Sequence, residues 1–157
     1  MIRADHVRLF DVEEDVPDAP EAIPFGVADI KRTGTDVTIV AMSHAVRRAL
    51  EAAEELATEG ISAEVVDPRT LVPLDHGAIL TSVGKTGRLI VVDEGHRSAG
   101  VGAGIAAMIA ERAFESLRKP IRRIATLDVP IPFSPPLERF VEPTTAKIVA
   151  VAMDLVG

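Results

Sequence analysis

The sequence predicts an α/β protein with a mostly parallel sheet covered by helices on both faces. Three observations predict this class. Short apolar runs rich in Val and Ile, such as residues 37–42 and 89–92, are typical of strands buried on both faces. Residues 45–58 show the apolar periodicity of an amphipathic helix. Strand-like and helix-like stretches alternate at the spacing of βαβ crossovers, which favours parallel pairing.

The same patterns place the individual elements along the chain. The expected strands are residues 26–31 at an edge of the sheet, 37–42, 61–66, 89–92 and 121–125. The expected helices are residues 45–58, 76–83, about 98–117, a single turn at 137–140, and 144–156. The proline-dense residues 128–136 are expected to be extended and irregular.

Several residues indicate where the expected helices begin and end. Ser43, Asp75 and Thr144 stand immediately before helical stretches and are the expected N-caps. Gly60 is expected to stop the first helix, because glycine readily ends helices. Residues 84–87 are expected to form the turn into the strand at 89–92.

Composition limits the possible classes of function. At 157 residues the chain is long enough for one domain with its own core, and 47% of it is hydrophobic. The formal charge of −7 disfavours binding to nucleic acid or anionic membranes, but suits a partner with a basic patch. The absence of cysteine excludes disulfides and thiolate chemistry and favours a cytoplasmic location. No apolar run approaches the ~20 residues that span a bilayer.

Residues 1–24 are expected to be an acidic, proline-rich linker with the remnant of a preceding domain. Acidic residues and prolines crowd the second half of this stretch without periodicity, which is typical of an extended surface segment. The domain itself is expected to occupy residues 25–157.

A turn that carries Asp93, Glu94 and His96 follows the expected strand at 89–92. The carboxyl ends of strands are where α/β proteins usually bind ligands. One hypothesis is therefore a general acid–base histidine tuned by the two carboxylates. The alternative hypothesis is a set of polar residues at a subunit interface.

Gly100, Gly102 and Gly104 follow that turn and resemble a phosphate-binding loop only in part. A dinucleotide-binding fingerprint has the spacing G-x-G-x-x-G at the first βαβ unit, whereas these glycines are spaced G-x-G-x-G after a later strand. Close packing at the start of a helix is the favoured interpretation. An anion bound at the helix N-terminus remains the alternative.

Arg69 lies between Asp67 and Asp75 in a loop stiffened by two prolines. It could bind an anionic substrate, but pairing with those two carboxylates is the favoured prediction. No group of His, Asp and Glu has a convincing metal-ligand spacing, so neither a metal site nor a cofactor site is predicted. His6 and His44 are not expected to have a function.

Residues 131–137, with the sequence IPFSPPL, are both apolar and rigid. An apolar strip on a protein surface more often marks a binding site than a solvated loop. Pro132, Phe133, Pro135 and Leu137 are therefore candidate interface residues.

Three stretches together resemble one protein family. They are VVDPRTLVPLD at residues 65–75, VVDEGHRSAGVGAGIAA at 91–107 and DVPIPFSPPLE at 128–138. In this order and spacing they resemble the C-terminal domain of the β subunit of thiamine-diphosphate-dependent 2-oxo acid dehydrogenases. This family includes the E1 components of the pyruvate, branched-chain 2-oxo acid and acetoin dehydrogenase complexes, and related domains occur in transketolase and deoxyxylulose-phosphate synthase.

The resemblance implies a three-layer α/β/α sandwich with a five-stranded sheet whose first strand, at residues 27–32, is antiparallel to the others. It also implies that thiamine diphosphate and Mg are bound elsewhere, by the E1 α subunit and by an N-terminal part of the β subunit. This chain contains no GDG motif, so no catalytic residue is predicted and no activity is expected of it alone. The stretch HVRLF at residues 6–10 resembles the last strand of that N-terminal part.

The expected function is assembly and docking within an E1 component. The expected partners are the E1 α subunit, the thiamine-binding part of E1 β, a second β copy and the basic peripheral subunit-binding domain of E2. Family members often carry other residues at the position of His96, which favours the interface hypothesis for the turn. A freestanding binding module and the equivalent domain of transketolase or deoxyxylulose-phosphate synthase remain alternatives. The candidate interface residues are Arg69, Asp93, Glu94, His96, Pro132, Phe133, Pro135, Leu137, Asp154 and Gly157.

Overall fold

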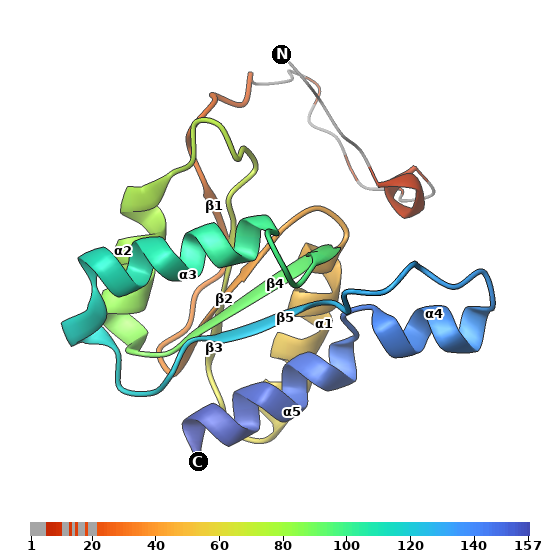
Figure 1. Ribbon diagram of the computed structural model, residues 1–157. Coiled ribbons are helices and arrows are strands. Elements are labelled where there is room, and N and C mark those ends of the chain that lie inside the picture. Colours follow the sequence, from red (N-terminus) through yellow and green to blue (C-terminus); the bar gives the residue numbers. More distant parts are fainter. Residues whose placement is uncertain (1–5, 11–12, 14, 16–17, 19–21) are drawn as a thin grey trace.

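The computed structural model describes residues 6–10, 13, 15, 18 and 22–157, and these residues form one α/β domain (Figure 1). In chain order the elements are η1 (Val7–Leu9), β1 (Asp29–Arg32), β2 (Val37–Ala41), α1 (Ala45–Thr58), β3 (Ala63–Asp67), α2 (His76–Thr86), β4 (Leu89–His96), α3 (Val101–Arg112), η2 (Phe114–Ser116), β5 (Arg122–Thr126), α4 (Pro135–Val141) and α5 (Thr145–Val156).

The sheet has five strands in the order β1-β3-β2-β4-β5. Strand β1 pairs antiparallel with β3, and every other neighbouring pair is parallel. The predicted fold class and the antiparallel first strand are therefore confirmed. The alternation of strands and helices along the chain was sufficient to predict the parallel part of this sheet.

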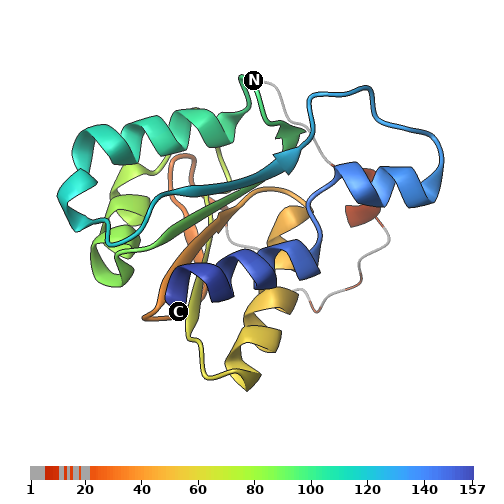
Figure 2. The ribbon, with the colours of Figure 1, turned by 60° about the horizontal axis from the view of Figure 1, so that its bottom comes forward.

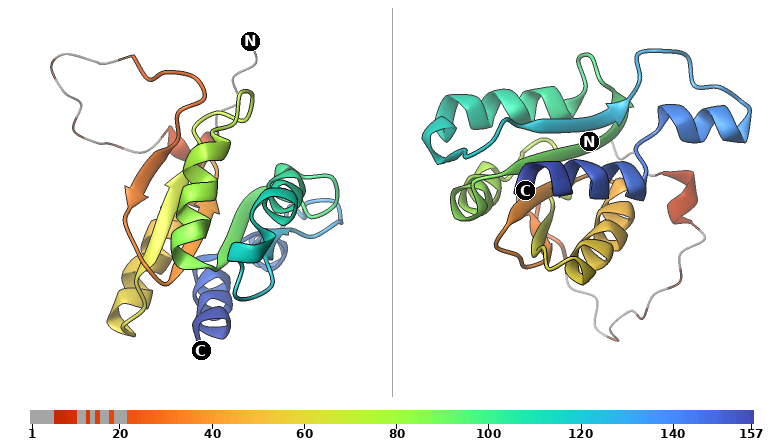
Figure 3. Two further views of the ribbon diagram at one scale, coloured as in Figure 1. Left: turned by 90° about the vertical axis from the view of Figure 1, so that its left-hand side faces the viewer. Right: turned by 90° about the horizontal axis from the view of Figure 1, so that it is seen from below.

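Helices cover both faces of the sheet, as Figures 2 and 3 show, and an apolar layer fills each side. On one face, α1 and α5 bury residues such as Leu56 and Ile148 against the sheet. On the other face, α2 and α3 contribute Ile79 and Ile109. Successive strand residues contribute to opposite layers, because side chains along a strand alternate between its two faces.

The connections after β2 and β4 leave the sheet in opposite directions. The chain passes from β2 to α1 on one face and from β4 to α3 on the other face. Since β2 and β4 are neighbours in the sheet, their carboxyl ends form a topological switch point. Open α/β sheets preferentially bind ligands at such points.

Strand β4 is longer than predicted and α3 is shorter. Asp93, Glu94 and His96 continue β4 instead of forming a turn, because pairing with β5 extends to His96 and Thr126. The backbone oxygen of Glu94 also accepts a hydrogen bond of 2.8 Å from the Thr126 hydroxyl. Helix α3 begins only at Val101, and the separate turn η2 follows it.

Two of the three predicted N-caps are confirmed. The side chain of Asp75 accepts a hydrogen bond from the backbone N–H of Ala78, and Thr144 accepts one from Lys147. The prediction for Ser43 was wrong: its φ is 55°, and the N-cap position belongs to His44, which makes no side-chain cap.

Helix α2 continues through residues 84–86, which were predicted to form a turn. It ends at Gly87, whose φ of 70° is the left-handed conformation that favours glycine. The single turn predicted at residues 137–140 is the seven-residue α4.

The prediction of a strand at residues 6–10 was wrong. Val7–Leu9 form a 3₁₀ turn, with a hydrogen bond of 2.9 Å from the Leu9 N–H to the His6 carbonyl oxygen. A strand needs a partner to pair its backbone, and the described residues offer none to this segment. Most of the predicted linker at residues 11–24 lies outside the described residues. No helix in the described part of the chain has the length and apolarity needed to cross a membrane.

Candidate interface site

The two acidic neighbours at the end of β4 point to opposite faces of the sheet. Asp93 faces α3, where its Oδ2 accepts a hydrogen bond of 3.2 Å from the Gly102 N–H. Glu94 faces α1, where its Oε1 lies 3.3 Å from the His44 Nδ1. The structure therefore does not bring the predicted acidic residues together in one cluster with His96.

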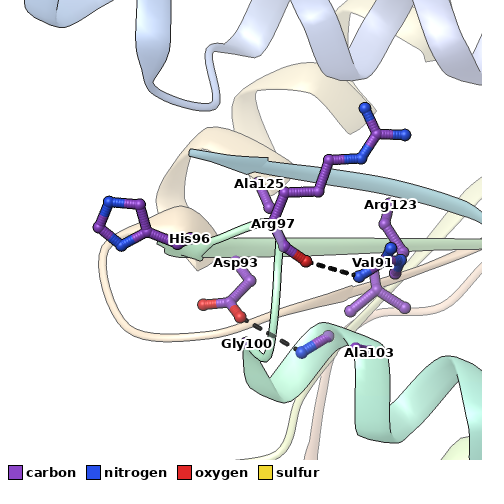
Figure 4. A pocket seen from close by; sticks show the side chains of 9 residues that line it. Val91, Asp93, His96, Arg97, Gly100, Ala103, Arg123 and Ala125 are labelled. Carbon is purple, nitrogen blue, oxygen red and sulfur yellow. Dashed lines mark hydrogen bonds between the residues drawn. The ribbon is translucent and has the colours of Figure 1, made fainter. Parts of the chain in front are cut away.

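Asp93 supplies the cap that α3 cannot obtain from its own N-cap residue, Gly100. Figure 4 shows its carboxylate beside the start of the helix, and its Oδ1 accepts a hydrogen bond of 2.9 Å from the Gly95 N–H. A carboxylate is favourable at this positive end of a helix. Because Asp93 already occupies the helix start, the alternative of an anion bound there loses its support.

Close packing explains two of the three glycines in this turn. A Cβ at Gly100 would lie 2.5 Å from the His96 carbonyl oxygen, and one at Gly102 would lie 3.3 Å from a Val91 methyl carbon. The same atom at Gly104 would meet nothing within 4 Å. The packing interpretation is confirmed for Gly100 and Gly102 and was wrong for Gly104.

Glu94 belongs to a charged cluster at the switch point that we call the Glu94 junction, made of Glu94, His44 and Arg48. The Arg48 guanidinium lies 3.8 Å from the Glu94 Oε1, and the His6 Nε2 lies 3.7 Å from the same atom. Burial lowers the pKa of His44, with Arg48 and His6 adding to this, against the opposing effect of Glu94. Sequence reasoning missed His44 and Arg48, although their i, i+4 spacing at the start of a helix was a usable signal.

Arg48 also ties α1 to the segment between α4 and α5. It donates hydrogen bonds to the carboxylate of Glu142 at 3.1 Å and to the carbonyl oxygen of Pro143. Lys147 donates at 2.6 Å to the carbonyl oxygens of Phe140 and Glu142. These contacts position α4 beside the carboxyl ends of the strands.

His96 binds the proline-dense loop rather than either carboxylate. Its Nε2 lies 3.2 Å from the Val129 carbonyl oxygen. Nearby, Asp128 accepts hydrogen bonds from the Ser98 backbone N–H and hydroxyl, which lower the pKa of Asp128. This arrangement gives His96 a role in holding the loop and gives no support to the acid–base hypothesis.

An apolar strip follows from this loop into α4. Phe133 is fully exposed, and Ile131, Leu137 and Phe140 expose more than half of their surface. Pro135 is also exposed, whereas Pro132 is half-buried. We use the name apolar strip for Ile131, Phe133, Leu137 and Phe140, of which the last was missed in the sequence.

Arg69 is held by a partner that the sequence did not predict. Its guanidinium donates a 2.7 Å hydrogen bond to Asp29 on β1, while its backbone N–H donates to Asp67. Asp75, the second predicted partner, instead accepts from the Ala28 and Ala78 N–H groups. Arg69 thus fixes the loop, as predicted, but through β1.

The predicted residues at the end of α5 lie apart from the other candidates. Asp154 forms an exposed ion pair of 2.8 Å with Arg122, beside a groove of ≈ 560 Å³ between β5 and α5. Gly157 ends the chain and is exposed. Among the described residues, no three His, Asp or Glu side chains gather closely enough to hold a metal ion.

Comparisons with known proteins identify the domain. The sequence model of the transketolase C-terminal domain matches residues 26–148. The β subunit of acetoin:2,6-dichlorophenolindophenol oxidoreductase from Bacillus subtilis is 47% identical over 94% of this chain and 43% of its own length. The β subunit of the pyruvate dehydrogenase E1 component from Rickettsia felis is 46% identical over 86% of this chain and 41% of its own length.

Solved structures support the same assignment. A split-gene transketolase, described as an inactive beta4 tetramer, matches with a TM-score of 0.77 and 30% identity, covering 92% of this chain and 45% of that chain. A 2-oxoglutarate:ferredoxin oxidoreductase from Magnetococcus marinus shares the fold. Its TM-score is 0.56 at 14% identity, and the match covers 83% of this chain and 19% of that chain. The chain spans less than half the length of these curated relatives. It belongs to the transketolase C-terminal domain family, as the three sequence stretches indicated.

Proposed function

We propose that this chain is the C-terminal assembly domain of an E1 β subunit, in a complex that oxidises a 2-oxo acid or acetoin. Its relatives at 46–47% identity are named as β subunits of an acetoin:2,6-dichlorophenolindophenol oxidoreductase and of the pyruvate dehydrogenase E1 component. The observation that carries the proposal is the apolar strip, which exposes two phenylalanines beside a rigid proline-dense loop. Large exposed apolar side chains that adjoin one another favour a protein partner over solvent.

In this proposal the apolar strip contacts other E1 subunits. Hydrogen bonds from Arg48 to Glu142 and from Lys147 to Phe140 hold α4 in place before any partner binds. A preorganised surface loses less conformational entropy on association. His96 and Asp128 add to this by fixing the loop that precedes the strip.

Docking of E2 is the second part of the proposal. The acidic net charge of −7 is complementary to the basic E2 domain that the family resemblance implies. Asp154 is already paired with Arg122, so its carboxylate must exchange partners to take part. Gly157 is exposed and is the other candidate near this end of α5.

The described residues do not fit thiamine diphosphate or its metal ion. They contain no cluster of three metal-binding side chains, and the glycine turn that precedes α3 is capped by Asp93. In this proposal the domain holds subunits together, and the family resemblance implies that the cofactor is bound by the E1 α subunit and the thiamine-binding part of E1 β.

Reconstitution tests this proposal. The chain is mixed with an E1 α subunit, a β N-terminal fragment, thiamine diphosphate and Mg, and the oxidation of pyruvate and of acetoin is measured. Activity is expected only when the chain is present with the other components. Equal activity without the chain would contradict the assembly role, and activity of the chain alone would contradict the whole proposal.

A transketolase-type subunit is the second candidate, because a split-gene transketolase matches this fold over 92% of the chain. The same reconstitution with a transketolase N-terminal subunit and sugar phosphates separates the two candidates. The chain is 30% identical to the split-gene transketolase and 47% identical to the β subunit of the acetoin enzyme. This difference favours the dehydrogenase.

A further inference from the structure

The Glu94 junction occupies the topological switch point of the sheet. His44 follows β2, Glu94 lies near the end of β4, and the two strands are neighbours whose connections leave toward opposite faces. This is the place where open α/β sheets bind ligands. The function proposed above makes no use of it.

The Glu94 carboxylate is only partly satisfied by this domain. Its Oε1 faces His44 at 3.3 Å and Arg48 at 3.8 Å, from the first turn of α1. Its Oε2 is buried and has no hydrogen bond within the described part of the chain. A buried carboxylate oxygen without a donor is unfavourable. The His6 ring lies against the other oxygen, Oε1, so its contribution is to the charge of the carboxylate and not to Oε2.

The chain's own N-terminal segment reaches this place. The His6 ring stacks on the His44 ring, with centroids 5.1 Å apart and planes inclined by 20°. The His6 Nε2 is 3.7 Å from the Glu94 Oε1. Figures 1 and 3 show the η1 turn that follows His6 at the carboxyl-terminal end of the sheet, on the side of α4.

We propose that the Glu94 junction is the docking site of the chain's own N-terminal segment, with His6 held between the His44 ring and the Glu94 carboxylate. The segment that leads into the acidic linker is thereby fixed at the switch point. The linker residues are strongly acidic, and the cationic side chain of Arg48 compensates the charge of Glu94 on the side of the domain. This inference stands independently of the proposed E1 function.

Two cationic and two acidic side chains lie around the junction. Arg48 and Lys147 are the cationic groups on this side, and Glu94 and Glu142 are the acidic ones.

Nuclear magnetic resonance of the full chain with labelled histidines tests the docking. In the unaltered chain we expect cross-relaxation between the His6 and His44 rings at pH 7.5, with slow hydrogen exchange at Leu9. Glu94→Gln is expected to remove the ring contact and to raise the exchange rate at Leu9 about fivefold, the equivalent of one weak ion pair. Glu54→Gln, an exposed change on α1, is the matched control.

A loss of docking can be distinguished from unfolding of the domain in the same spectra. His76 lies on α2 at the opposite face of the sheet and reports whether each variant is folded. His44→Ala, which removes the stacking partner and leaves Glu94 in place, is expected to shift the His6 resonances to those of a solvent-exposed ring. The proposal is overturned if the unaltered chain shows no contact between the two rings, or if His6 is unchanged in either variant while His76 reports a folded domain.

Discussion

At the scale of single residues, adjacent acidic side chains hold different layers of the domain together. Asp93 caps α3 on one face of the sheet, and Glu94 binds the start of α1 on the other. The alternation of side chains along a strand causes this separation. The sequence placed both residues correctly after a buried strand, but a turn was predicted where the strand continues. Because Asp93 and Glu94 point to opposite faces, they cannot act together with His96 on one reacting group.

A buried carboxylate under α2 gives the first residue-scale prediction. Glu64 on β3 accepts hydrogen bonds from Ser82, Lys85 and the Gly34 N–H. Burial raises its pKa, but these hydrogen bonds outweigh burial and leave the pKa below the ordinary glutamate value. Glu64→Gln is expected to lower the free energy of unfolding at pH 7 by about 1–3 kcal/mol, because a charge-assisted acceptor is lost.

The pH dependence of unfolding checks the same residue. A carboxylate with a lowered folded-state pKa contributes stability that is present above its unfolded pKa and lost as pH falls through its folded pKa. Urea unfolding of the unaltered chain should therefore lose stability below about pH 4.3. The Glu64→Gln variant should lose less over this range, and Glu54→Gln should behave like the unaltered chain. Parallel curves for Glu64→Gln and the unaltered chain would contradict the assignment.

At the scale of elements, the helices and strands predicted from the sequence were most accurate where tertiary packing and the local apolar pattern agree. Residues 45–58 were predicted as a helix and form α1 with the same bounds. The strand at 89–92 was too short because its polar continuation is stabilised by β5, a contact that periodicity cannot reveal. The long helix expected at 98–117 ends at Arg112, because Ala113 leaves the helical conformation, with a φ of −142°.

The glycines at the start of α3 give a prediction with an internal control. Gly100→Ala is expected to destabilise the domain by about 1–3 kcal/mol, since its Cβ would lie 2.5 Å from the His96 carbonyl oxygen. Gly104→Ala in the same helix meets open space and should stabilise it by about 0.5–1 kcal/mol, because alanine favours the helix. Thermal unfolding of the two variants should shift in opposite directions. A shift in the same direction would show that packing does not require glycine at residue 100.

The N-cap of α2 is a second prediction at this scale. Asp75 accepts hydrogen bonds of 3.0 Å from the N–H groups of Ala28 and Ala78, and the bond from Ala28 is the main cause of its lowered pKa. It therefore joins the residue that precedes the edge strand β1 to the start of α2. Asp75→Ala should lower the free energy of unfolding by about 1–2 kcal/mol. Hydrogen exchange should accelerate at both Ala28 and Ala78; acceleration at Ala78 alone would show that Asp75 acts only as a helix cap.

At the scale of the whole molecule, the sequence predicted the fold and the rigid apolar segment but not the junction at the switch point. Fold class follows from patterns within short windows, and the apolar strip is nearly continuous in sequence. The Glu94 junction joins residues 44, 48 and 94, and residue 6 reaches it; the order of the strands brings them together. His6 had no distinguishing sequence context, so only the structure revealed its contact with His44.

Assembly through the apolar strip is the prediction that concerns the whole molecule. Phe133→Asp combined with Leu137→Asp should leave the isolated domain folded, because both side chains are exposed and contribute nothing to either core layer. If both become buried in an interface, the loss of about 1.5–3 kcal/mol for each side chain should weaken association at least 100-fold. Sedimentation of the variant with an E1 α subunit and a β N-terminal fragment measures this loss. Phe114→Asp changes another exposed phenylalanine, on η2, and should leave association intact. Equal weakening by both changes would mean that the strip is not the specific contact surface, whereas weakening by the strip variant alone would place the subunit interface on the loop and α4.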